Sequence, residues 1–102
     1  MRISCYGAQY DITIHKSVYG NGQTCLYATV DDEVWGKLTV AIDGVKLGEG
    51  EIIAKTYSEN GVWVPQLLVS YPDMFVDTGK RVKCGYTEAE IWKYSPPNDE
   101  GV

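Results

Sequence analysis

The sequence predicts an α+β fold in which an antiparallel, mostly meandering sheet of about five to seven strands carries one short helix. Three observations predict it. Apolar and polar residues alternate with a period of two along much of the 102-residue chain, as in half-buried strands. Eleven Gly and four Pro divide the chain into short segments, and aromatic residues, which favour strands, make up 12% of it. An open sheet and a partly closed barrel fit this pattern equally well.

Four strands are expected in the first half of the chain. In the second of them, Tyr10, Ile12 and Ile14 alternate with polar residues, which predicts one buried face. The next segment, Gly20-Asn21-Gly22-Gln23, predicts a hairpin turn, because Asn-Gly supplies the positive φ angles that a tight turn needs. The expected strands are residues 2–6, 9–19, 24–31 and 34–43.

The only helical pattern lies in the second half of the chain. Ser58 resembles a helix N-cap, but Pro65 would break a helix that began there and suits a first helical position instead. A short helix is therefore expected at about residues 64–70, ended by Pro72. Thr78-Gly79-Lys80 is expected to form a turn. The remaining expected strands are residues 51–57, 74–76, 81–85 and 87–94.

One domain is expected over residues 1–94, followed by a polar, Pro-rich tail at residues 95–102 that should fray. No secretory signal pattern and no apolar run of membrane-spanning length is present in the sequence. A cytoplasmic protein with reduced thiols and no membrane partner is therefore expected.

The formal net charge is −5, and this acidity limits the classes of ligand. Binding to phosphates requires an excess of Lys and Arg on one face, so direct binding to free nucleic acid is not expected. An acidic balance often serves solubility alone. It would also suit a protein partner that has a basic groove.

The candidate metal ligands are Cys5, His15, Cys25 and Cys84. They contain the right atoms for a tetrahedral zinc site, but no two of them have the short spacing of a zinc knuckle. His15 and Cys25 could approach each other across the predicted hairpin. We therefore expect no cofactor, with buried or surface roles for these side chains, and keep a zinc site assembled by the fold as the minor alternative.

No motif in the sequence predicts an enzyme. A Cys–His pair can activate a thiolate, but no third group to orient the His is indicated. Glu88 and Glu90 lie on one face of a predicted strand, where they are expected to be solvated rather than raised in pKa by an apolar pocket. The glycine-rich stretch at residues 44–50 lacks the Gly-Lys-Ser/Thr ending of a phosphate-binding loop.

The class of function that remains is recognition of a protein partner by surface residues. The three Trp, with Tyr86 and Tyr94, exceed what a small sheet must bury, and Trp and Tyr are common anchors at interfaces. Equally, these aromatic residues could fill the thin core beneath the helix. The candidate partner-binding residues are Asp31, Asp32, Glu33, Glu59, Trp63, Glu88, Glu90 and Trp92.

The chain resembles a family of small uncharacterised proteins, a domain of unknown function, from phages and other bacterial mobile elements. The pieces that carry the resemblance span about residues 9–94, and the sequence departs from the pattern at residues 61–65, where similar sequences continue into a longer charged helix. These pieces are Tyr19-Gly20-Asn21-Gly22, Gly36-Lys37-Leu38-Thr39-Val40, Lys55-Thr56-Tyr57-Ser58-Glu59-Asn60, Asp77-Thr78-Gly79 and Gly85-Tyr86.

The resemblance implies a function in conflict between mobile elements and their hosts. Small acidic proteins of this origin are often inhibitors of host defence, such as anti-CRISPR proteins, and they carry no catalytic motif. We therefore expect a non-enzymatic inhibitor that binds a CRISPR effector in the host cytoplasm as a monomer or dimer. The alternative is a structural or accessory phage protein that self-associates through a sheet edge.

Overall fold

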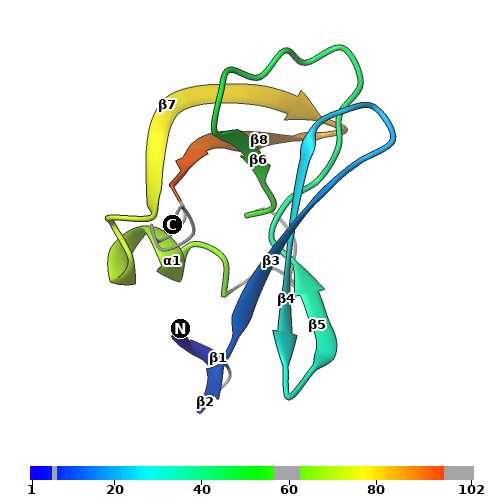
Figure 1. The fold of residues 1–102 in the computed structure, drawn as a ribbon. Coiled ribbons are helices and arrows are strands. Elements are labelled where there is room, and N and C mark those ends of the chain that lie inside the picture. The colour runs from blue at the N-terminus through cyan, green and yellow to red at the C-terminus, as the bar shows by residue number, and fades with distance from the viewer. Residues whose placement is uncertain (6, 57–62, 96–102) are drawn as a thin grey trace.

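The computed structural model describes residues 1–5, 7–56 and 63–95, which form eight strands and one short helix (Figure 1). The strands are antiparallel, as predicted, but they form three small sheets instead of one sheet of five to seven strands. The elements are β1 (Arg2–Cys5), β2 (Ala8–Asp11), β3 (Thr13–Val18), β4 (Thr24–Val30), β5 (Glu33–Lys37), β6 (Glu51–Ala54), α1 (Gln66–Ser70), β7 (Phe75–Cys84) and β8 (Thr87–Tyr94).

The strand predicted at residues 9–19 is interrupted at Ile12, where the chain passes from one sheet to another. The part before Ile12 is β2 and pairs with β1, whereas the part after it is β3 and pairs with β4. Ile12 is buried, and its N–H donates to the carbonyl oxygen of Met1 at 2.6 Å. The period-two pattern continues through this residue, so the pattern alone did not reveal the change of sheet.

The second sheet has the order β3-β4-β5 and contains the predicted hairpin. The turn is closed by the N–H of Tyr19, which donates to the carbonyl oxygen of Gln23 at 2.8 Å, and Gly22 has a φ of 90°. Gly suits this position because it adopts positive φ without a steric penalty. In the following turn, Asp31 and Asp32 also have positive φ, which Asp tolerates better than most residues.

The strand predicted at residues 34–43 ends at Lys37, and the next residues join two sheets. The N–H of Leu38 donates to the carbonyl oxygen of Leu26 on β4 at 3.0 Å. The carbonyl oxygen of Leu38 accepts a hydrogen bond from the N–H of Lys55 at 2.7 Å. The N–H of Val40 donates to the carbonyl oxygen of Ile53 on β6 at 3.1 Å. This three-residue connection therefore ties the second sheet to the third.

The third sheet has the order β6-β8-β7. The turn predicted at Thr78-Gly79-Lys80 is instead a bulge within β7. Asp77 lies opposite Trp92 and Lys80 lies opposite Ile91, so two extra residues of β7 stand between neighbouring residues of β8. Gly79 has a φ of 88°, and its N–H donates to Oδ1 of Asp77 at 2.9 Å. The two short strands predicted around this segment are consequently one ten-residue strand.

The predicted short helix is confirmed as α1, which begins after Pro65 and ends before Pro72. Side chains of this segment satisfy the backbone of β1. The hydroxyl of Tyr71 accepts from the N–H of Arg2 at 2.6 Å and donates to its carbonyl oxygen, and the amide of Gln66 bonds both backbone groups of Ser4. The proposed N-cap Ser58 and residues 96–102 of the predicted tail lie outside the described residues.

The main core lies between the sheets and the helix, and its largest fully buried side chains are those of Trp92 and Phe75. A smaller core lies on the opposite face of the third sheet, where Ile53, Ala89 and Ile91 are buried. Residues of the connection from Val40 to Leu47 cover this second core. Within the described chain, no helix has the length and apolar character needed to cross a bilayer.

Candidate functional site

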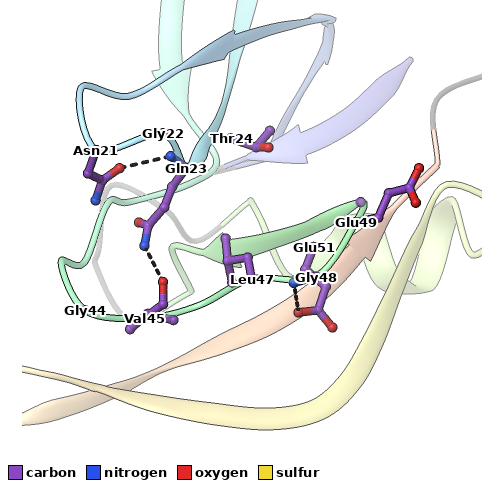
Figure 2. Close-up of a pocket in the computed structure, with 11 residues that line it drawn as sticks. Asn21, Gly22, Gln23, Thr24, Gly44, Val45, Leu47, Gly48, Glu49 and Glu51 are labelled. Atoms are coloured by element: carbon purple, nitrogen blue, oxygen red, sulfur yellow. Dashed lines mark hydrogen bonds between the residues drawn. The ribbon is translucent and has the colours of Figure 1, made fainter.

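A polar pocket of about 390 Å³ lies between the β3–β4 turn and the glycine-rich connection that precedes β6 (Figure 2). We call it the turn–loop pocket. Its volume lies within the range of roughly 300–1,000 Å³ found for small-molecule sites. The residues that line it are Asn21, Gly22, Gln23, Thr24, Gly44, Val45, Leu47, Gly48, Glu49, Gly50 and Glu51.

The side chain of Gln23 holds the two walls of this pocket together. Its Nε2 donates to the carbonyl oxygens of Ile42 at 2.8 Å and Val45 at 2.9 Å, and its Oε1 accepts from the N–H of Ile42 at 2.9 Å. Beside it, the amide of Asn21 donates to Oδ1 of Asp43 at 3.0 Å. The turn therefore fixes the position of the connection, although neither segment forms a ladder with the other.

Glu51 closes the third side of the pocket and remains charged. Its Oε1 accepts from the N–H of Gly48 at 2.8 Å, and its Oε2 lies 2.7 Å from Nζ of Lys80. The hydrogen bond from Lys80, with that from Gly48, lowers the pKa of the Glu51 carboxyl below its ordinary value. Lys80 reaches this position from the bulge in β7, which gives the bulge a role in shaping the pocket.

The acidic turn Asp31-Asp32-Glu33 lies far from this pocket. All three residues are exposed at the tip of the β4–β5 hairpin, which Figure 1 places at the opposite end of the molecule from the tip of the β7–β8 hairpin. Asp31 and Asp32 both have positive φ, so the three carboxylates are carried next to one another on a tight turn. Of the predicted acidic residues, these three are brought together and projected into solvent.

Glu88 and Glu90 have a different environment. They lie on β8, directly opposite Lys83 and Arg81 on β7, so opposite charges face each other across the hairpin. Glu90 also accepts a hydrogen bond from Nε1 of Trp92 at 2.9 Å. Arg81 forms its ion pair with Asp77 at 2.9 Å, so Glu88 and Glu90 lie beside cationic residues but form no salt bridge within the described residues.

Trp63 and Trp92 are core residues, so the expectation that they are exposed anchors is wrong. Trp92 is 0% exposed and Trp63 is 3% exposed. Trp63 packs on Trp35 with ring centroids 4.9 Å apart, and Trp92 packs against Phe75 at 6.0 Å. The third-sheet face that carries Trp92 turns inward, which a strand pattern with apolar residues on both faces does not reveal. Glu59 lies outside the described residues.

Among the aromatic residues that the structure describes, the fully exposed one is Tyr86, with a relative exposure of 111%. It follows Gly85, whose φ is 66°, in the two-residue turn between β7 and β8. Tyr86 is one of the surplus aromatic residues of the sequence but is not among the predicted site residues. Its position in a tight turn after Gly is the signal that could have found it, because a side chain there has no strand neighbour to cover it.

The candidate metal ligands are not assembled into a site. Cys5 and Cys25 are buried free thiols in different sheets. His15 stacks on Tyr27, and its Nε2 lies 2.9 Å from Oγ1 of Thr29. Cys84 ends β7. No group of three or more metal-binding side chains occurs within residues 1–5, 7–56 and 63–95.

Comparison with known proteins adds no relative from which a function could be transferred. No protein-family model, no curated protein and no solved structure matches this chain.

Proposed function

We propose that this protein is a non-enzymatic inhibitor from a phage or mobile element that acts on a bacterial defence complex. The proposed target is a CRISPR effector in the host cytoplasm, which the protein binds as a monomer or dimer. Binding would block the effector from holding or cleaving nucleic acid. The resemblance to proteins of phages and mobile elements supplies this class of partner.

The observation that supports the proposal is the turn Asp31-Asp32-Glu33. Its three exposed carboxylates would compete with nucleic-acid phosphates for the Lys and Arg side chains of an effector groove. The described residues contain eleven Asp and Glu and all nine Lys and Arg, so their overall charge is small. A local concentration of negative charge, rather than the total charge, is therefore the feature that a basic partner would recognise.

The decisive experiment measures DNA cleavage by a panel of purified CRISPR effectors, with DNA binding measured in parallel. The test variant combines Asp31→Asn, Asp32→Asn and Glu33→Gln. It removes charge but preserves the turn, because Asn tolerates positive φ at least as well as Asp. A matched control, Asp73→Asn, removes one exposed carboxylate in the turn before β7.

We expect the wild-type protein and the control to inhibit one effector, and the test variant to inhibit it weakly. Inhibition should fall as salt is raised, because exposed charges are screened. Loss of cleavage together with loss of DNA binding would indicate competition for the groove. Absence of inhibition across the panel would contradict the proposal.

The alternative, self-association of a structural phage protein through a sheet edge, has less support. The long strand β7 is an edge strand of the third sheet. It carries exposed Lys80, Arg81 and Lys83, and it contains a bulge. Charged side chains and bulges are features that protect an edge from pairing. Light scattering of the purified protein tests this alternative, since a defined higher oligomer would favour it.

A further inference from the structure

We infer that the free edge of β3 binds an extended segment of a partner protein as an added strand. The segment that fits carries an apolar, an acidic and an apolar residue at alternate positions, opposite Ile14, Lys16 and Val18. This edge lies on a different strand from the acidic turn after β4, and the inference does not depend on the function proposed above.

The backbone of β3 has unused hydrogen-bonding groups on one side. In an antiparallel pair, residues bonded to the neighbouring strand alternate with residues that point away from it. Lys16 lies opposite Leu26 on β4. The N–H of Leu26 donates to Oγ1 of Thr39 at 3.1 Å, and its carbonyl oxygen accepts from Leu38 at 3.0 Å, so both groups are turned away from β3. By this alternation, the N–H and carbonyl groups that point to the free edge are those of Ile14, Lys16 and Val18.

No part of the described chain covers these groups. β3 is an edge strand of the second sheet, and no residue within 1–5, 7–56 and 63–95 bonds the backbone of the three residues from the free side. The six residues of β3 pair with β4 in unbroken register, so this edge has no bulge, unlike β7. A regular edge with free N–H and carbonyl groups is the template that strand addition requires.

An apolar hollow of about 270 Å³ lies beside the start of this edge. In a strand added beside β3, the side chain opposite Ile14 lies on the same face as that of Ile14, which places it at the hollow. At the other end of the strand, Val18 is 65% exposed and offers a second apolar contact. The residues opposite Ile14 and Val18 are therefore expected to be apolar. The hollow is lined by Met1, Ile12, Thr13, Ile14, Met74 and Tyr94.

Lys16 decides which occupant fits the edge. It is the only Lys, Arg, Asp or Glu in β3, it is exposed, and it forms no salt bridge within the described residues. A carboxylate opposite it would form a favourable cross-strand pair. A second copy of this chain fits less well, because antiparallel pairing through the same three residues would place Lys16 opposite Lys16 of that copy, and like charges in that position are destabilising. The occupant is therefore a segment of a different protein with the pattern apolar–x–acidic–x–apolar.

The test is an NMR titration of the full ¹⁵N-labelled chain with the peptide acetyl-Ser-Val-Thr-Glu-Thr-Val-Ser amide. We expect saturable shifts and slower hydrogen exchange at the amides of Ile14, Lys16 and Val18, because each gains an acceptor. Replacing the Glu of the peptide by Gln should weaken binding by about two- to fivefold, the effect of one exposed ion pair. Lys16→Gln should have the same effect, and the two changes together should weaken binding no more than either alone. The matched control Lys83→Gln, which removes an exposed charge from β7, should leave binding unchanged.

Three outcomes would overturn the inference. Slow exchange of the three amides before any peptide is added would show that another part of the chain already covers the edge. A dimer of the protein alone in light scattering, with the same amides protected, would show that a second copy is the occupant. Shifts without slower exchange, or equal affinity of the Glu and Gln peptides, would show that the peptide does not add as a strand paired at Lys16.

Discussion

Gln23 provides the sharpest test of how the turn–loop pocket and the second core are held together. Replacing it by Ala removes three hydrogen bonds, two to carbonyl oxygens of Ile42 and Val45 and one from the N–H of Ile42. A hydrogen bond contributes roughly 0.5–1.5 kcal/mol net, so three could contribute about 1.5–4.5 kcal/mol. Water can reach this half-buried site in the variant, so we expect the lower part of that range, about 1.5–3 kcal/mol.

The assay is urea unfolding followed by Trp fluorescence, since two of the three Trp are buried in the main core. Gln9→Ala is the matched control, because Gln9 is exposed on β2 and its side chain makes no hydrogen bond within the described residues. We expect the control to change the free energy of unfolding by less than about 0.5 kcal/mol.

Hydrogen exchange locates the effect of the same substitution. In Gln23→Ala, the amide of Ile42 loses its acceptor and should exchange faster, whereas amides in the β1–β2 pair should not change. If Gln23→Ala and Gln9→Ala have the same free energy of unfolding, the side chain of Gln23 does not hold the connection in place.

Three further predictions concern the third sheet. Hydrogen bonds from Lys80 to Glu51 and from Arg81 to Asp77 lower the pKa of both carboxyls in the folded protein. These ionised carboxylates therefore stabilise the fold above the unfolded pKa of about 4, and this stabilisation is lost as pH falls toward the folded pKa values. Acid titrations of stability should therefore flatten in Glu51→Gln and Asp77→Asn; an unchanged acid profile would contradict this. Gly79→Ala should cost about 1–2 kcal/mol in urea unfolding because its φ is 88°, although a Cβ there meets no atom within 4 Å. Tyr86→Ser should leave the free energy of unfolding within about 0.5 kcal/mol of wild type, because the side chain is fully exposed; a larger loss would show that the ring packs on the hairpin.

The sequence predicted the local elements more successfully than their assembly. The hairpin turn at Asn21-Gly22 and the helix after Pro65 follow from backbone chemistry that acts within a few residues, and both are confirmed. Ile12 and the segment after Lys37 were misassigned because their geometry depends on partners distant in the chain, Met1 in one case and β4 and β6 in the other. Period-two alternation continues whether or not the strand changes sheet.

The candidate site was predictable only where exposure follows from a turn. Asp31-Asp32-Glu33 lies in a charged turn and is exposed as expected. The sequence left open whether the aromatic residues are exposed or fill the core. Trp92 could not be decided because the third sheet is covered on both faces, and Trp63 could not because its packing on Trp35 joins segments distant in the chain. The turn–loop pocket was missed because its walls are brought together by Gln23, a residue with no distinctive motif.

The side-chain contacts from Gln66 and Tyr71 to the backbone of β1 have a consequence for the order in which the chain can fold. These contacts join residues separated by 62 and 69 positions. Neither contact can form before its second partner exists, so the free side of β1 stays unsatisfied until the helical segment has been synthesised and has left the ribosome. A nascent chain arrested before Gln66 would therefore expose the unpaired side of its first strand, and chaperone binding should be greatest at those intermediate lengths.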